Sequence, residues 1–233
     1  MRQVKIPTVD GLEVHLSSRD GQMSDPNQSP ANSLGSFAEQ VAAGTPTPGG
    51  GSVAAYCGVL ATALGRMMCN LTIGKQKYAA VEPRVSEINS RLEQLGADLR
   101  RLIDDDAASF EGVLAAYRLP KETAEQKAER TRLIGEASRL AAEVPFRTAE
   151  RALDVLRLLG ELGGIGNQNA LPDANMAAQL SKAAISGAYY NIVVNLATAS
   201  DKDEADATRR AIGSIMEEAG RLAAELESRL IEP

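Results

Sequence analysis

The sequence predicts an all-α bundle of about seven helices, several of them long, preceded by a flexible N-terminal tail. From Ser33 onward, apolar residues recur every three or four positions, which is the spacing of one buried helix face. Aromatic residues make up only 3% of the chain, Trp is absent and alanine is abundant. This composition favours helices packed through small side chains over a sandwich or a barrel. No alternation typical of a strand extends far outside the tail.

The chain divides into two regions by composition. Residues 1–32 are rich in Ser, Asp, Asn, Pro and Gly, which predicts the flexible tail. Residues 33–233 form the predicted helical domain, and a total of 233 residues suits one domain with a tail.

The first predicted helix has Ser33 or Ser36 as its N-cap and ends at Gly44. The connector TPTPGGGS follows, in which prolines stiffen one half and glycines loosen the other. Ser52 is the expected N-cap of an apolar helix that runs to about Thr72.

A long helix is predicted from Pro83 to Tyr117, and Pro120 interrupts the pattern after it. The next helix begins near Glu122 and ends before Pro145. The apolar stripe of the long helix consists of Val85, Ile88, Leu92, Leu95, Leu99, Leu102, Phe110, Val113 and Leu114.

Pro145 suits the first turn of another helix, which reaches about Leu162. The glycine- and asparagine-rich segment GGIGNQNALPD is expected to be a loop. Asp173 then starts a helix that runs to about Ser200. The stripe of the last helix consists of Ile212, Ile215, Ala219, Leu222, Leu226 and Leu230.

Charge and apolar patterning exclude several classes of partner. The formal net charge is -6, and basic residues alternate with acidic ones without a basic run. Nucleic acid and anionic membrane surfaces are therefore not expected as partners. The most apolar stretch, residues 53–73, contains Arg66 and Asn70, so a buried core helix is expected there and no membrane span.

The two cysteines suit a reducing compartment. Cys57 and Cys69 fall on one predicted helix. The helical rise places them roughly 18 Å apart, too far for a disulfide. Unpaired thiols and the absence of an apolar signal core at the N-terminus lead us to expect a cytoplasmic protein.

The chain contains a single histidine, His15, in the predicted tail. Mechanisms that need a catalytic histidine, and histidine-rich metal sites, are therefore not expected. Any general acid or base must be Asp, Glu, Lys, Tyr or a bound water.

The proline–glycine connector is the first candidate site. Three glycines allow a close approach of the backbone, and the helix N-terminus that follows offers free N–H groups to an anion such as a carboxylate. The alternative is a tight turn between packed helices. The candidate binding residues are Pro48, Gly49, Gly50, Gly51 and Ser52.

Two ionisable groups form the second and third candidates. Lys75 follows the apolar helix and can reach a cleft, although a solvated lysine at a helix C-terminus is the alternative. Asp104, Asp105 and Asp106 are turned by about 100° from one another, so they cannot face one way. Asp106 lies near the apolar stripe, where partial desolvation raises the pKa of a carboxyl, whereas an exposed acidic run is the alternative.

The fourth candidate is GNQNALPD with the helix after it. Asn167 lies in this segment, and Asp173 is either a first-turn acid or a functional carboxylate. Asn191 and Asn195 are i,i+4 neighbours in the apolar segment GAYYNIVVNL. Buried amides need partners, which can be each other, another helix or a ligand.

Taken in order, these blocks resemble one known family. TPTPGGGSVAA, NLTIGKQKY, DDDAASF with YRLPK, VP, GNQNALPD and GAYYNIVVNL are similar to the formimidoyltetrahydrofolate cyclodeaminases, a family that includes stand-alone methenyltetrahydrofolate cyclohydrolases. The resemblance extends from about Ser36 to Leu226. Pro172 departs from it, because a Ser is expected before the Asp, and this puts hydrogen bonding near Asp173 in question.

The resemblance implies an all-helical subunit that dimerises, with its active site in a cleft at or near the dimer interface. The cyclodeaminases close 5-formiminotetrahydrofolate to 5,10-methenyltetrahydrofolate and release ammonia. The cyclohydrolases add water to the methenyl carbon and open the ring to 10-formyltetrahydrofolate. The bifunctional members carry a formiminotransferase domain, for which this chain has no room, so we expect a stand-alone hydrolase or a deaminase supplied by a separate enzyme.

The resemblance also suggests roles for the candidate residues. Asp106 is the expected acid or base, Lys75 protonates a leaving nitrogen or pairs with Asp106, and Asp173 is the second carboxylate. The glycine turn approaches the folate or its glutamate tail, and no metal or redox cofactor is needed. The amides expected to orient the pterin ring are those of Asn167, Asn191 and Asn195. The alternatives are a non-catalytic assembly or regulatory protein of the same fold, and an enzyme on this scaffold with another substrate.

Overall fold

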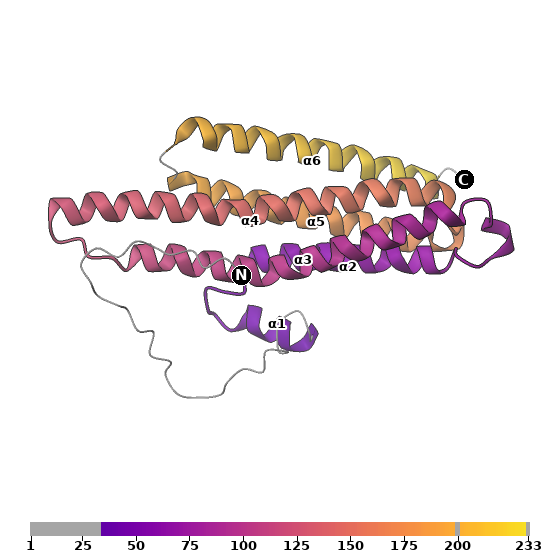
Figure 1. The fold of residues 1–233 in the computed structure, drawn as a ribbon, viewed down its shortest axis with the longest axis horizontal. Coiled ribbons are helices and arrows are strands. Elements are labelled where there is room, and N and C mark those ends of the chain that lie inside the picture. The colour runs from indigo at the N-terminus through magenta and orange to yellow at the C-terminus, as the bar shows by residue number, and fades with distance from the viewer. Residues whose placement is uncertain (1–33, 199–200, 232–233) are drawn as a thin grey trace.

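The computed structural model describes residues 34–198 and 201–231, and within them it contains helices and no strand. The predicted tail, residues 1–32, lies outside the described residues. These described ranges contain six α-helices, where about seven are predicted for the chain. Figure 1 shows their arrangement. They are α1 (Leu34–Ala42), α2 (Gly50–Asn70), α3 (Glu82–Tyr117), α4 (Ala124–Ile165), α5 (Leu171–Asn195) and α6 (Lys202–Ile231). Short 3-10 turns occupy Gln76–Tyr78, Gln168–Ala170 and Leu196–Thr198.

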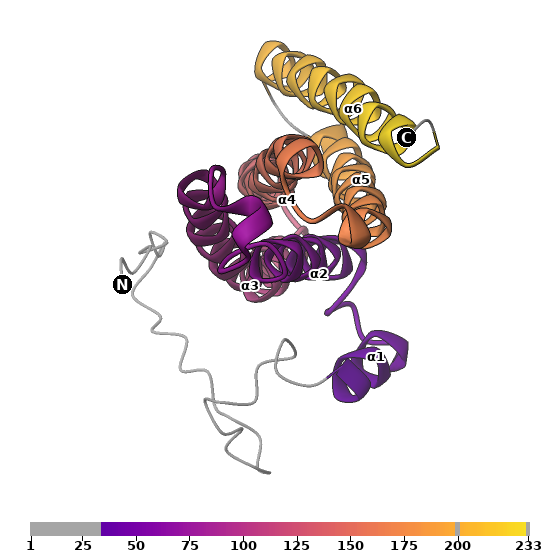
Figure 2. The same cartoon turned by 90° about the vertical axis from the view of Figure 1, so that its right-hand side faces the viewer.

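Helices α2 to α5 form a four-helix bundle. Each packs against the next in the chain, and α5 closes the ring by packing against α2. α6 covers the outer side of α4 and α5, and Figure 2 shows it on the side of the bundle opposite α1. α1 contacts α2 through the rings of Phe37 and Tyr56, whose centroids are 5.3 Å apart. The predicted all-helical bundle is therefore confirmed.

Most of the predicted apolar stripes form the core. On α3, every predicted position is buried except Phe110 and Leu114, which are half-buried. On α6, Leu230 is 42% exposed, whereas Ile212 and Leu226 are fully buried. Small residues bring α2 close to its neighbours, because a Cβ on Gly65 would lie 2.9 Å from Leu92 of α3 and 3.0 Å from Leu159 of α4.

α2 is the central apolar helix of this bundle. By length and composition it is the only helix of the described residues apolar enough to cross a membrane, with a mean hydropathy of 1.3. However, 50% of that stretch is buried within the fold, as expected for the core helix of a bundle. Both cysteines, Cys57 and Cys69, lie on α2 and are free, which confirms the prediction of unpaired thiols.

The expected break at Pro145 is wrong, and this accounts for the missing helix. α4 continues through Pro145, which is buried inside the helix. Proline has no N–H to give to the carbonyl four residues earlier, that of Ala141. The side-chain Nδ2 of Asn195, on α5, donates to that carbonyl at 3.0 Å instead. An amide from another helix thus satisfies the acceptor that the proline leaves open, and α4 does not end.

Two other boundaries are also wrong. Ser52 is not the N-cap of α2. The helix begins at Gly50, so the capping residue is Gly49, and glycine has no side chain that could bond the first turn. GGIGNQNALPD is largely helical, because α4 extends to Ile165 and α5 starts at Leu171. Pro172 fits the first turn of α5, where its missing N–H has no helical partner to lose.

Candidate functional site

The predicted site residues lie at opposite ends of α2. Gly50, Gly51 and Ser52 form its first turn, directly after Pro48 and Gly49 of the connector. Lys75 comes after its other end. Because α2 has 21 residues, these two ends are roughly 30 Å apart within one chain. We call the residues around the first turn of α2 the Asp106 end, because Asp106 of α3 contacts that turn. We call the residues around the C-terminal end of α2 the Lys75 end.

Asp106 binds the first turn of α2. The Ser52 hydroxyl donates to Asp106 Oδ2 at 2.9 Å, and the backbone N–H of Ser52 donates to the same carboxylate. A Cβ on Gly51 would lie 2.1 Å from Asp106 Oδ1, so the carboxylate occupies the space of the missing side chain. Asp106 therefore caps α2 from a neighbouring helix and accepts one of the N–H groups that a helix start leaves open.

The environment of Asp106 sets it apart from its two neighbours. Burial raises the pKa of Asp106 above its ordinary value of 3.8, and the hydrogen bonds from Ser52 oppose this rise. Asp104 and Asp105 are exposed, and Asp105 lies 3.8 Å from the guanidinium of Arg147 on α4. The prediction that Asp106 is the partly desolvated member of the run is confirmed.

The two asparagines of α5 have different surroundings. Asn191 Nδ2 donates to the Gly187 carbonyl at 2.9 Å and lies 3.7 Å from the position of a Cβ on Gly50. Asn191 therefore belongs to the Asp106 end. Asn195 uses its Nδ2 on the carbonyl of Ala141, so it binds another helix, which is one of the three options that the sequence leaves open.

At the Lys75 end, Asn167 is buried, with 6% of its surface exposed, and it forms hydrogen bonds to several neighbouring segments. Its Nδ2 donates to the Leu71 carbonyl at 3.1 Å, and its backbone N–H donates to Thr72 Oγ1 at 2.9 Å. Its Oδ1 accepts from the Asn169 N–H at 3.1 Å and from the Tyr78 hydroxyl at 3.4 Å. Asn167 thus ties the turn between α4 and α5 to the C-terminal end of α2.

Lys75 itself is exposed and makes no ion pair with any other residue of the described ranges. It follows Gly74, which adopts a φ of 77° and whose N–H donates to Glu82 Oε2 at 2.9 Å. This bond ties the turn before Lys75 to the start of α3. Asp173 is half-buried in the first turn of α5, where the helix dipole favours a carboxylate.

A family model described as formiminotransferase-cyclodeaminase matches residues 33–214 of this chain. The chain belongs to this family. Its sequence is 36% identical over 186 residues to the methenyltetrahydrofolate cyclohydrolase of Methylorubrum extorquens, which covers 80% of the chain and 89% of that protein. It is also 35% identical over 192 residues to the formimidoyltransferase-cyclodeaminase of Rattus norvegicus, which covers 82% of the chain and 36% of that protein.

The chain thus spans about a third of the length of the bifunctional rat relative. A solved formiminotetrahydrofolate cyclodeaminase from Thermotoga maritima has the same fold, with a TM-score of 0.70 and 30% identity. That match covers 84% of this chain and 92% of the Thermotoga chain. The resemblance inferred from the sequence blocks is therefore confirmed.

Three side chains that hold the site together in this chain were not singled out from the sequence. Tyr78 and Thr72 hold Asn167, and Glu82 holds the turn before Lys75. The available signal was their position within or next to the block that contains Lys75. Gly187 is a fourth omission, since a Cβ there would lie 2.8 Å from Ala54 of α2. Its bare backbone allows α5 to approach the start of α2.

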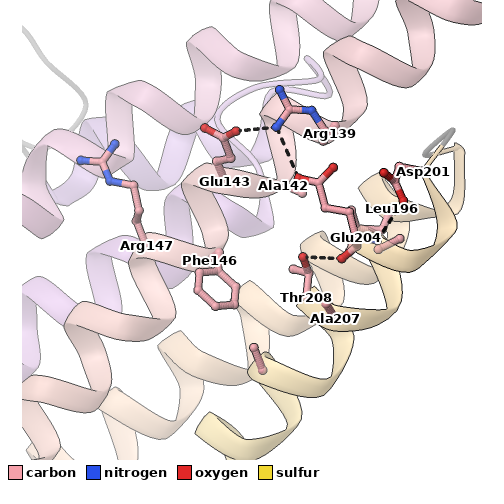
Figure 3. A pocket seen from close by; sticks show the side chains of 12 residues that line it. Arg139, Ala142, Glu143, Phe146, Arg147, Leu196, Asp201, Glu204, Ala207 and Thr208 are labelled. Carbon is pink, nitrogen blue, oxygen red and sulfur yellow. Dashed lines mark hydrogen bonds and ion pairs between the residues drawn. The ribbon is translucent and has the colours of Figure 1, made fainter.

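A cavity of about 480 Å³ lies elsewhere, between α4 and α6, and no predicted site residue lines it (Figure 3). Its wall contains Phe146 and Leu196. On its rim, Arg139 lies between Glu143, at 3.0 Å, and Glu204, at 3.7 Å. Arg139 is therefore already paired with carboxylates of the protein, and because one positive and two negative charges sum to −1, no cation is left unpaired by this group. The two ends of α2 remain the candidate site, since they hold the predicted residues.

Proposed function

We propose that this chain is a methenyltetrahydrofolate cyclohydrolase, an enzyme that acts on the amidine-type carbon of a tetrahydrofolate derivative. The observation that carries the proposal is Asp106, a half-buried carboxyl with a raised pKa, fixed against the first turn of α2. A stand-alone cyclohydrolase related over 89% of its length supports this choice. The second candidate is the cyclodeaminase reaction, which the related Thermotoga structure favours.

The chemistry needs a proton acceptor and a proton donor. Water adds to the methenyl carbon and loses a proton to Asp106, which gives a tetrahedral adduct. The bond from that carbon to N5 then breaks, with its electrons going to nitrogen, and Lys75 supplies the proton that N5 gains. As the formyl C=O forms, the hydroxyl of the adduct loses its proton, which returns to Lys75. In the deaminase reaction, N10 adds to the formimino carbon and loses its proton to Asp106, and the formimino nitrogen is protonated and leaves as ammonia. Neither sequence of steps requires a metal or a redox cofactor.

The other predicted residues complete the proposed site. The glycine turn and Asn191 lie beside Asp106, where they can contact the pterin ring. Asp173 is the second carboxylate, at the Lys75 end. Asn167 and Asn195 already bond protein groups, so we propose that they act on the substrate only through the segments that they hold.

One chain cannot bring Lys75 and Asp106 to the same carbon, because roughly 30 Å separates the two ends of α2. We propose a homodimer in which α2 and α5 of the two subunits pack antiparallel. A two-fold axis across the middle of α2 would place the Lys75 end of one subunit against the Asp106 end of the other.

The outer faces of α2 and α5 support this arrangement. They carry apolar residues at helical spacing, and large apolar surfaces left exposed mark interaction sites. Met67 on α2 is 36% exposed, and Leu71, the residue that caps the C-terminal end of α2, is 41% exposed. On α5, the exposed fractions are 54% for Met176, 65% for Tyr190 and 71% for Val194.

The test of the activity is an absorbance assay with purified protein and 5,10-methenyltetrahydrofolate. We expect the methenyl chromophore to disappear faster than in the uncatalysed reaction, and Lys75→Ala to remove the acceleration without unfolding the protein. Lys121→Ala, in the turn between α3 and α4, is the control for loss of an exposed lysine. No acceleration with this substrate and none with 5-formiminotetrahydrofolate would contradict the enzyme proposal.

The homodimer has its own test. Sedimentation equilibrium should give a dimer for the natural sequence. Ala63→Arg, on the outer face of α2, should give a folded monomer without activity. Ala224→Arg, on the exposed side of α6, is the matched control and should remain dimeric and active. The proposal further includes a cytoplasmic location and no nucleic-acid or membrane partner.

A further inference from the structure

Ser52 was expected to contact substrate, but it is fully buried, with 0% of its surface exposed. Its hydroxyl has two acceptors within reach. Asp106 Oδ2 lies at 2.9 Å and the carbonyl oxygen of Ile103 lies at 3.2 Å, both on α3. A hydroxyl has one proton and two lone pairs, so Ser52 can donate fully to only one of these oxygens at a time.

We propose that Ser52 is a positioning residue for Asp106, and that its hydroxyl exchanges hydrogen-bond partners each time Asp106 gains or loses a proton. When Asp106 is a carboxylate, Ser52 donates to Oδ2, because a charged acceptor makes the stronger bond. When Oδ2 is protonated, it donates to Ser52 Oγ, and Ser52 donates to the Ile103 carbonyl. Only the O–H bonds rotate, so both forms of Asp106 remain hydrogen-bonded in one geometry.

This exchange suits a group that carries a proton through a reaction cycle, and in that respect the inference rests on the proposed function. An acid or base that loses its partner in one protonation state would have to move or to leave a buried polar atom unpaired. Asp106 lies in the space that Gly51 leaves beside its Cα, close to the Ser52 hydroxyl, so the exchange needs no movement of the carboxylate.

Other charges around Asp106 do not substitute for Ser52. α2 has no charged side chain before Arg66, and α5 has none after Lys182. From α4, Arg147 is paired with Asp105, the neighbour of Asp106 on α3. Within one subunit, the pKa of Asp106 is raised by burial and lowered by hydrogen bonds from Ser52, and no neighbouring charge contributes.

The test is the titration of the Asp106 side-chain carboxyl, followed by ¹³C NMR in the intact protein without substrate. In Ser52→Ala the carboxylate loses a donor, so we expect the midpoint to move to higher pH. The corresponding limb of the kcat/KM profile should move with it. Ser181→Ala is the matched control, because Ser181 is also 0% exposed but donates only within its own helix, to the Ala177 carbonyl.

Two further variants separate the hydroxyl from the packing. Ser52→Thr keeps the hydroxyl and should restore the natural midpoint. Ser52→Cys adds no carbon atom, and its weak S–H donor should give an intermediate midpoint if the threonine methyl prevents folding. An unchanged midpoint in folded Ser52→Ala would overturn the inference. A shifted midpoint in a protein that turns over no folate would overturn the proposed function and support the exchange at Ser52.

Discussion

The two ends of α2 hold their functional groups in opposite ways. Asp106 is half-buried and is fixed by Ser52 and by the space above Gly51. Lys75 is exposed, and the bonds around it hold the turn on which it stands and leave its amine free of ion pairs among the described residues. Burial raises the pKa of the Asp106 carboxyl, whereas the side chain of Lys75 is exposed to solvent. A group presented outward suits a site that is completed by a second subunit.

The difference between the two ends of α2 matters for catalysis only if Asp106 is the group that transfers the proton. Asp106→Asn keeps the shape but cannot take up a proton, so kcat/KM should fall by about 10²–10⁴-fold. Steady-state kinetics with the methenyl substrate measure this fall. Asp105→Asn, at the exposed neighbour, should remain within about twofold of the natural enzyme, as expected away from the site. Near-normal turnover in Asp106→Asn would remove the Asp106 end from the mechanism.

Gly51→Ala breaks the same end from the helix side. A Cβ 2.1 Å from Asp106 Oδ1 must push the carboxylate away, and a shift of about 1 Å can cost about 10²-fold in rate. Kinetics and thermal melting should both show a loss. Gly112→Ala on α3 is the control, because no atom lies within 4 Å of its Cβ position. That variant should be slightly stabilised, since alanine favours a helix.

The helices beside the Asp106 end depend on the bond from Asn195 to Ala141. Asn195→Ala leaves the Ala141 carbonyl without its side-chain donor, so the free energy of unfolding should fall by about 1–3 kcal/mol in urea titrations. Pro145→Ala restores a backbone N–H to that carbonyl. In the Pro145→Ala background, Asn195→Ala should therefore cost much less. Equal costs in both backgrounds would show that Asn195 does not replace the missing donor.

The smallest expected effect is a change in how the thermal stability of the protein depends on pH. Because burial raises the folded-state pKa of Asp106, its contribution to stability is fully present below 3.8 and is lost as pH rises through the folded-state pKa. Asp106→Asn should thus raise Tm at pH 7, by about 2–4 °C for each 1 kcal/mol gained. The gain should shrink towards pH 4. Melting curves across this range that keep a constant difference would contradict the assignment.

Local patterns predicted much of this architecture. The stripe from Val85 to Leu102 is buried as expected, because a helix repeats its core face every 3.6 residues. Asp106 could also be singled out, since its distance from that stripe is a local property. The resemblance to the family rested on blocks of local sequence, and the family match confirms it.

Relations between distant residues could not be predicted. The continuation of α4 through Pro145 depends on Asn195, whose amide comes from another helix. Ser52 could pass for a helix cap, because its partner Asp106 lies 54 residues further along the chain. The separation of Lys75 from Asp106 likewise follows from the length of α2 and the antiparallel packing of the bundle. A single sequence motif specifies neither of these properties.

The central claim, that the two ends of α2 from different subunits form one site, has a direct test. Lys75→Ala and Asp106→Asn variants are mixed in equal amounts and allowed to exchange subunits, and turnover of 5,10-methenyltetrahydrofolate is measured. Half of the dimers become mixed, and one of the two sites in each is intact, so activity should recover to about a quarter of the natural level. A mixture that is no more active than the average of the two separate variants would contradict the claim.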